Sequence, residues 1–73
     1  MITVKSKIKD ICENDEAYAI VHELNPGFDR DDPRLHEADN MSLKALLAFP
    51  ASKCPKDLQK KIAAALEDAE IDD

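Results

Sequence analysis

The chain has 73 residues, of which 16 are acidic and 10 are basic, so its formal net charge at pH 7 is −6. A chain of this length buries only about 60% of the surface that its unfolded form exposes, which leaves little stability to support a strained catalytic site. We therefore expect a single domain over residues 1–73 that is not an enzyme. The negative charge repels phosphate backbones and anionic headgroups, which argues against binding to nucleic acid or membrane surfaces.

No apolar run approaches the roughly 18 residues needed to cross a bilayer, and the N-terminus lacks the basic and apolar segments of an export signal. We therefore expect a cytoplasmic protein that is a monomer in isolation. Cys12 and Cys54 lie far apart in the sequence and form no Cys-x-x-Cys pair. They are typical of two small buried hydrophobes or free thiols, and a disulfide between them stays open as an alternative.

The first segment predicts an extended arm followed by a short helix. Residues 1–5 alternate apolar and polar side chains, which suits a strand-like arm across the core. Ser6 is placed to cap the helix, because its hydroxyl can accept a backbone N–H of the first turn. The helix would turn three side chains inward, namely Ile8, Ile11 and Cys12.

A second helix is predicted from about residue 16 to residue 24, after a cap at Asn14 or Asp15. Its apolar stripe consists of Ala17, Ile20, Val21 and Leu24. Asn25-Pro26 stops this helix, because proline lacks a backbone donor and disfavours helical geometry in the preceding residue.

Pro26-Gly27 is typical of a type II turn in which glycine adopts a positive φ, and Phe28 would then fold back onto the core. Residues 29–40 are polar and acidic, and we expect a loop with one helical turn that begins at Pro33 after Asp32.

A third helix is predicted to begin at the cap Ser42, with Met41 packing on Leu46 as a hydrophobic staple. Its inner face would consist of Leu43, Leu46 and Leu47, and Phe49-Pro50 would end it.

The last helix is predicted to start with Pro55 at its first position. Its inner face would consist of Leu58, Ile62, Ala65, Leu66 and Ala69. The predicted fold is all-α: a compact bundle of four to five short helices with a short extended N-terminal arm. Phe28 and Phe49 would be the bulkiest side chains of its core.

None of the possible metal or catalytic motifs is complete. His36-Glu37 begins like a zinc protease helix, but Asn40 occupies the position of the second histidine. The acidic residues after Asp29 do not match a calcium loop, which needs glycine at its sixth position and glutamate at its twelfth. A zinc set is conceivable only from scattered residues, namely Cys12, His22, His36 and Cys54. We therefore expect no catalytic residue, no metal and no cofactor.

The order of several short motifs carries a resemblance to a known kind of domain. These motifs are Glu16-Ala17, Asn25-Pro26-Gly27, Asp32-Pro33-Arg34 and Asn40-Met41-Ser42-Leu43-Lys44. Over nearly its whole length the chain resembles a small helical domain at the C-terminus of bacterial glycoside hydrolases and carboxylesterase-like enzymes, especially in gut Firmicutes. The resemblance implies an accessory role beside a catalytic domain. It implies no activity, because none of the shared residues is catalytic.

We therefore expect a non-catalytic accessory or protein-interaction domain whose partner is a catalytic domain or another protein. Its contact surface is predicted at the turn before the acidic loop and the outer side of the third helix, with Phe28, Met41, Leu43 and Lys44. The alternative is a small carbohydrate-binding module, which would stack aromatic rings on sugars. The three aromatic residues, Tyr18, Phe28 and Phe49, all have an explanation as core residues, which favours contact with protein.

Overall fold

The computed structural model describes residues 1–72, with the backbone alone for Ala51. The described chain is all-α, as predicted, and forms a small helical globule without strands. Its elements are α1 (Ile8–Glu13), α2 (Asp15–Leu24), α3 (Pro33–His36), α4 (Leu43–Ala48), the 3₁₀ helix η1 (Pro50–Ser52) and α5 (Lys56–Ala69).

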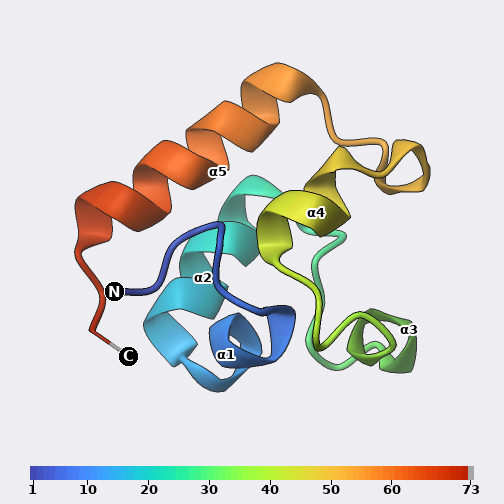
Figure 1. The fold of residues 1–73 in the computed structure, drawn as a ribbon, viewed down its shortest axis with the longest axis horizontal. Coiled ribbons are helices and arrows are strands. Elements are labelled where there is room, and N and C mark those ends of the chain that lie inside the picture. The colour runs from blue at the N-terminus through green and yellow to red at the C-terminus, as the bar shows by residue number, and fades with distance from the viewer. Residues whose placement is uncertain (73) are drawn as a thin grey trace.

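The two longest helices, α2 and α5, pack on each other. α2 also packs on α1, and α4 lies against α5. Figure 1 shows α5 along one side of the molecule and α3 at the far end from both termini. The backbone N–H of Ile2 donates to the carbonyl of Ile71 at 2.9 Å, so the start of the arm lies beside the segment that follows α5. The arm is not extended over its whole predicted length, because residues 4 and 5 form a turn in which the N–H of Ser6 donates to the Thr3 carbonyl at 3.0 Å.

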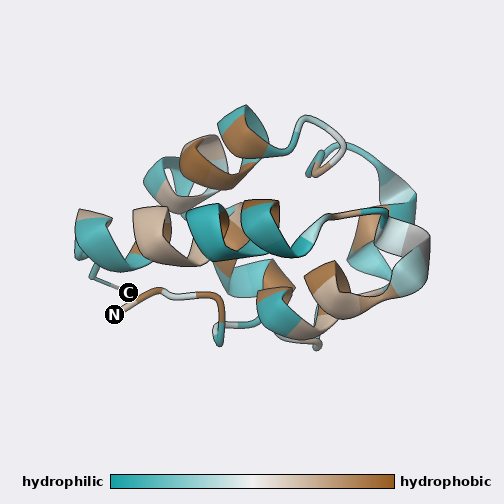
Figure 2. Cartoon of the chain, turned by 90° about the horizontal axis from the view of Figure 1, so that it is seen from above, coloured by the Kyte–Doolittle hydropathy of each residue, from teal (hydrophilic) through white to brown (hydrophobic). Residues whose placement is uncertain are grey.

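One aliphatic core joins all the long segments. Its fully buried members are mainly isoleucine and leucine: Ile2, Ile8, Ile11, Leu43, Ile62 and Leu66. Figure 2 shows that the hydrophobic residues gather on the inner sides of the helices, which is the pattern that amphipathic spacing dictates. Phe28 is only 3% exposed and fills this core, as predicted.

Phe49 is not a core residue, and this part of the prediction is wrong. Its side chain is 52% exposed. In α4 the inward positions are Leu43 and Leu47, and two further residues correspond to a rotation of about 200°, away from the core. The helix also ends at Ala48, after which Phe49 takes an extended conformation with ψ 133°.

The starts of α1 and α4 pair with each other, and we call residues 4–9 and 39–44 the α1–α4 joint. Lys7 and Ser42 form an antiparallel bridge. The N–H of Ile8 donates to the carbonyl of Met41 at 2.8 Å, and the N–H of Leu43 donates to the carbonyl of Ser6 at 3.0 Å. Each helix start therefore supplies an acceptor to the other.

A second pair of hydrogen bonds extends the joint. The N–H of Lys9 donates to the Asp39 carbonyl at 3.1 Å, and the N–H of Lys44 donates to the Val4 carbonyl at 2.7 Å. The first amides of a helix have no partner within the helix, and leaving them buried without one costs free energy. The joint satisfies two such amides in each helix with backbone alone.

The predicted caps were right for α4 and wrong for α1. The Ser42 hydroxyl accepts from the N–H of Ala45 at 3.1 Å, as expected. Lys7, and not Ser6, is the N-cap of α1, and it makes no side-chain capping bond. The Ser6 hydroxyl instead accepts from the N–H of Thr3 at 3.0 Å and so folds the arm.

The caps of α2 and α3 agree with the sequence. The Asn14 side chain accepts from the N–H of Ala17, and the Asp32 side chain accepts from the N–H of Arg34. Pro33 is the first residue of α3, as predicted.

The predicted type II turn is wrong. The N–H of Phe28 donates to the Asn25 carbonyl at 2.9 Å, so a turn does form at Pro26-Gly27. Gly27, however, does not have a positive φ. A Cβ at this position would approach the Asn25 side-chain oxygen at 3.4 Å, which is an ordinary contact. The turn therefore does not need the conformational freedom of glycine.

α5 begins one residue later than predicted, with Pro55 as its N-cap and Lys56 as its first residue. The side-chain amide of Gln59 donates to the Cys54 carbonyl at 2.9 Å. This bond ties the first turn of α5 to the preceding linker. Two of the predicted inner-face residues, Ile62 and Leu66, are fully buried, Leu58 and Ala69 pack against the core from its edge, and Ala65 is half-buried.

Candidate functional site

The structure separates the four residues that the sequence placed on one contact surface. Phe28 and Leu43 are 3% and 0% exposed, so their side chains belong to the core and are not available to a partner. Met41 is half-buried, and Lys44 is exposed. Leu43 thus serves the fold, because the spacing that makes a helix amphipathic turns its large side chains inward. Phe28 joins the same core from the segment between α2 and α3.

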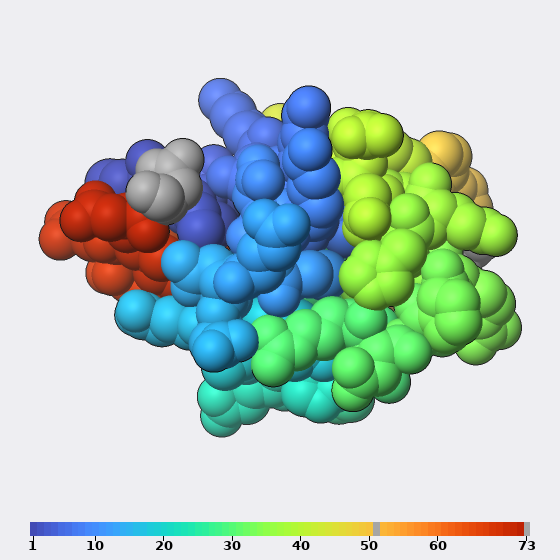
Figure 3. Space-filling view, turned by 90° about the horizontal axis from the view of Figure 1, so that it is seen from below, coloured from blue at the N-terminus to red at the C-terminus, as the bar shows by residue number. Residues whose placement is uncertain are grey.

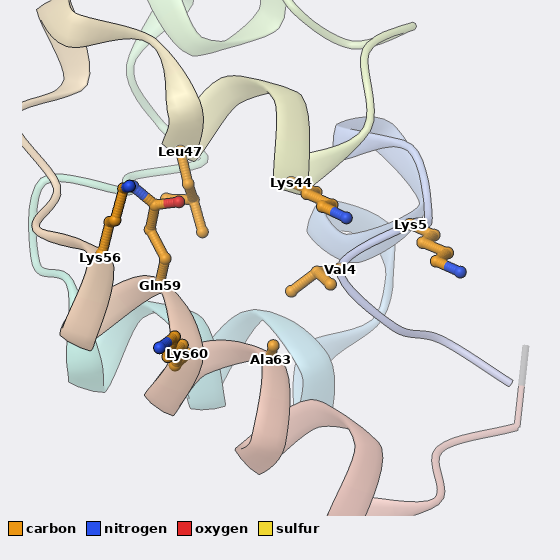
Figure 4. A pocket seen from close by; sticks show the side chains of 8 residues that line it. All are labelled: Val4, Lys5, Lys44, Leu47, Lys56, Gln59, Lys60 and Ala63. Atoms are coloured by element: carbon orange, nitrogen blue, oxygen red, sulfur yellow. The ribbon is translucent and has the colours of Figure 1, made fainter.

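A hollow with a volume of about 330 Å³ lies beside Lys44, and we call it the lysine groove. Its lining residues are Val4, Lys5, Lys44, Leu47, Lys56, Gln59, Lys60 and Ala63. Figure 4 shows Val4 and Leu47 on opposite sides of the groove, with lysines around its edge.

Three separate segments build the lysine groove. The backbone N–H of Lys44 donates to the Val4 carbonyl and so holds the arm against α4. This contact brings Lys5 and Lys44 to one end of the groove. Lys56 and Lys60 are four residues apart, so they lie on the same side of α5 at the other end.

The charges of the lysine groove are not neutralised locally. All of the charged residues that line it are lysines. Among residues 1–72, none of these four ammonium groups forms an ion pair with a carboxylate. Both arginines, by contrast, are paired: Arg30 with Asp15 at 2.8 Å and Arg34 with Asp32 at 3.0 Å.

A second and larger hollow, of about 540 Å³, is lined in part by exposed Phe49, and we call it the Phe49 cleft. Its lining residues are Asn25, Gly27, Phe28, Asp32, Arg34, Leu35, Leu46, Leu47, Phe49 and Ser52. The Ser52 hydroxyl lies 2.7 Å from the Phe49 carbonyl and 3.0 Å from the Leu47 carbonyl, so η1 is fastened to the end of α4.

The remaining aromatic side chains hold the acidic loop in place. The Tyr18 ring stacks on His22 with a centroid distance of 5.3 Å, and the Arg30 guanidinium lies 4.4 Å from the Tyr18 centroid. The Tyr18 hydroxyl accepts from the N–H of Arg30 at 3.2 Å. Arg30 also donates to the Cys12 carbonyl at 3.3 Å. In Figure 3 the green part of this loop accordingly lies against the light-blue α1–α2 region.

Both ring nitrogens of His36 have hydrogen-bond partners. Its Nδ1 lies 3.0 Å from an Asp39 carboxylate oxygen, and its Nε2 lies 2.6 Å from the Arg30 carbonyl. Both partners are acceptors, so only the protonated imidazole donates to both. The carbonyl of Arg30, followed by the carboxylate of Asp39, raises the pKa of His36 above its usual value of 6.5.

The four residues of the conceivable zinc set do not converge. No group of three or more metal-binding side chains comes together within residues 1–72. His22 Nδ1 lies 2.8 Å from the Phe28 carbonyl, and both nitrogens of His36 have partners of their own. Cys12 and Cys54 are free thiols, and burial raises the pKa of both. A raised pKa suppresses the thiolate, which is the form that binds metals and attacks electrophiles.

Comparisons with protein-family models, with curated proteins and with solved structures found no match to this chain. Among residues 1–72, no helix combines the length and the apolar character that crossing a membrane requires.

Proposed function

We propose that this chain is a non-catalytic interaction domain that packs against a glycoside hydrolase or esterase-type catalytic domain, with the Phe49 cleft as the contact surface. The observation that carries the proposal is the 52% exposure of Phe49, the only large hydrophobe besides Met1 that the described chain leaves exposed. The enzyme class of the partner rests on the resemblance of the sequence motifs.

Burial of the Phe49 ring by a partner would be favourable. Complete burial of a phenylalanine side chain is worth about 1.5–3 kcal/mol, and aromatic residues are frequent among the residues that dominate interface energies. Partly buried Leu35 and Leu46 line the same cleft as Phe49, and so do Asp32 and Arg34, which form an ion pair. An apolar centre with polar residues at the rim is the usual anatomy of a protein interface.

The test is an NMR titration of the ¹⁵N-labelled chain with a catalytic domain of this class that is encoded in the same reading frame or beside it. We expect amide shifts at Leu46, Phe49 and Ser52, and at least tenfold weaker binding for Phe49→Ala, which corresponds to about 1.4 kcal/mol. The control is Glu16→Ala, on the exposed side of α2. Unchanged amide shifts, or equal binding by Phe49→Ala, would refute the proposal.

One observation supports a second candidate, a carbohydrate-binding module. The exposed Phe49 ring is available to stack on a pyranose, and Asn25, Asp32 and Arg34 line the same cleft. A buried Phe49 would exclude this role, but Phe49 is exposed. Titration with cello- and xylo-oligosaccharides distinguishes the two: saturable shifts around Phe49 at millimolar sugar would favour the carbohydrate-binding module.

A further inference from the structure

We propose that the lysine groove binds an acidic segment of the partner protein, with an aliphatic side chain on the groove floor and carboxylates against the lysines. This inference rests on the proposed function, because it assumes a protein partner, but it concerns a different surface from the Phe49 cleft. Only Leu47 lines both hollows.

The floor of the groove sets the apolar part of the ligand. Val4, Leu47 and Ala63 supply it, and all three lack polar side-chain atoms. The volume of about 330 Å³ is at the small end of the range of ligand sites. It suits one or two aliphatic side chains from a chain that continues beyond the groove.

The rim sets the charge of the ligand. Four of the ten basic residues of an acidic protein line this one hollow, and they come from the arm, α4 and α5. Their mutual repulsion is not relieved by any ion pair within residues 1–72. An incoming carboxylate would relieve it, and the positive rim would steer acidic segments toward the groove.

The overall charge favours a protein segment over an anionic membrane. At a net charge of −6 the molecule as a whole is repelled by a negatively charged lipid surface. A short acidic peptide meets less of this repulsion, because it contacts the lysine groove and little of the remaining acidic surface, whose charges are screened by salt. Lysines at both ends of the groove can then hold carboxylates on either side of a central aliphatic residue.

The probe is a synthetic twelve-residue peptide with two central leucines flanked by glutamates. Two matched peptides replace the glutamates with lysine or the leucines with serine. We expect the acidic leucine peptide to shift the amides of Lys44, Gln59, Lys60 and Ala63, and its affinity to fall as salt is raised from 50 to 500 mM. The lysine peptide should cause no shifts there, and the serine peptide should bind at least about tenfold more weakly.

Two double variants that change the net charge equally distinguish the contribution of the groove lysines to peptide binding from that of the protein's overall charge. Lys44→Glu/Lys60→Glu reverses one lysine at each end of the groove, and Lys9→Glu/Lys61→Glu reverses two exposed lysines outside it. We expect at least a tenfold loss of peptide affinity for the first and less than about threefold for the second. Circular dichroism checks that each folds, and Lys44→Gln/Lys60→Gln is the milder alternative.

Several outcomes would overturn the inference: no shift at the groove with millimolar peptide, an equal loss for both double variants, or equal binding of the serine peptide. Binding to phosphatidylserine vesicles with the same sensitivity to Lys44→Glu/Lys60→Glu would reassign the groove to lipid. Phe49→Ala should leave peptide affinity unchanged. Failure of the peptide therefore leaves the Phe49 cleft untouched, and failure of the catalytic-domain titration leaves the peptide result intact.

Discussion

The starts of α1 and α4 look alike in sequence, because a serine lies shortly before each of these six-residue helices. The two serines nevertheless form different hydrogen bonds. Ser42 is immediately before α4 and caps the N–H of Ala45. Ser6 is one residue too early for that role. The third amide of α1, at Asp10, donates instead to the Lys7 carbonyl at 3.0 Å. A displacement of one residue thus changes a capping side chain into one that folds the arm.

What the two starts share is the backbone pairing of the joint. The first two amides of each helix donate to carbonyls of the opposite segment. Helices this short are unstable alone, because the free energy lost in nucleating a helix exceeds the free energy gained from the hydrogen bonds of one or two turns. Neither helix start is therefore complete without the other, and the side-chain cap adds stability to only one of them.

The largest expected loss of stability comes from truncating the side chain of the first residue of α1 or of α4. Ile8 and Leu43 are both 0% exposed. Ile8→Ala and Leu43→Ala should each lower the free energy of unfolding by about 2–5 kcal/mol. A domain of this size rarely has more than about 3–5 kcal/mol in total, so both variants should be largely unfolded by circular dichroism at 25 °C.

The milder variant Ile8→Val keeps this prediction measurable, with an expected loss of about 0.5–1.5 kcal/mol in urea denaturation. A folded Leu43→Ala protein beside an unfolded Ile8→Ala protein would show that the two starts do not depend on each other.

A smaller effect is expected from the two serines. Ser42→Ala removes a cap and should cost about 1 kcal/mol in urea denaturation. Ser6→Ala should cost less, because the released N–H of Thr3 is only partly buried and can bond to water. Equal losses in the two variants would contradict the assignment of different roles.

The smallest expected effect is a pH dependence of stability that acts on the start of α1 and not on the start of α4. Protonated His36 bonds to Asp39, whose carbonyl accepts the N–H of Lys9 in α1. The pKa of His36 is raised on folding, so its contribution is fully present below pH 6.5 and is lost as the pH rises through the folded pKa. The free energy of unfolding should therefore fall as the pH is raised above about 6.5, and the fall should be absent in His36→Gln.

Amide hydrogen exchange provides the comparison within one molecule. After correction for the intrinsic pH dependence, raising the pH should reduce the protection of the Lys9 amide more than that of the Lys44 amide, which donates to Val4 in the arm. Equal loss of protection at both amides would place the effect of His36 outside the joint.

The sequence predicted the parts of the fold that depend on local signals. Apolar residues at helical spacing, a cap at Asn14 or Asp15, Pro33 at a first helical position and the cap Ser42 predicted α2, α3 and α4, because each of these signals lies within a few residues of the helix start that it marks. The α1–α4 joint could not be predicted. It pairs backbone groups that are distant in the chain, and an isolated backbone pairing requires no particular residue types that a sequence pattern could reveal.

The candidate sites were less predictable than the fold. Lys44 was chosen as a surface residue, but its groove also needs Lys5, Lys56 and Lys60, which only the tertiary arrangement brings together. Phe28 and Phe49 could not be distinguished by residue type. The two-residue step from Leu47 to Phe49 was a usable signal, because it places the ring opposite the inner face of α4.

The hydrogen bond between Ile2 and Ile71 has a consequence for protein engineering. In Figure 1 the first residues of the chain lie beside the segment that follows α5, so a host polypeptide could enter and leave the module close to one point. Such geometry permits circular permutation and insertion into a surface loop of another protein. New ends opened at exposed Lys53, between η1 and α5, would leave the α1–α4 joint uncut.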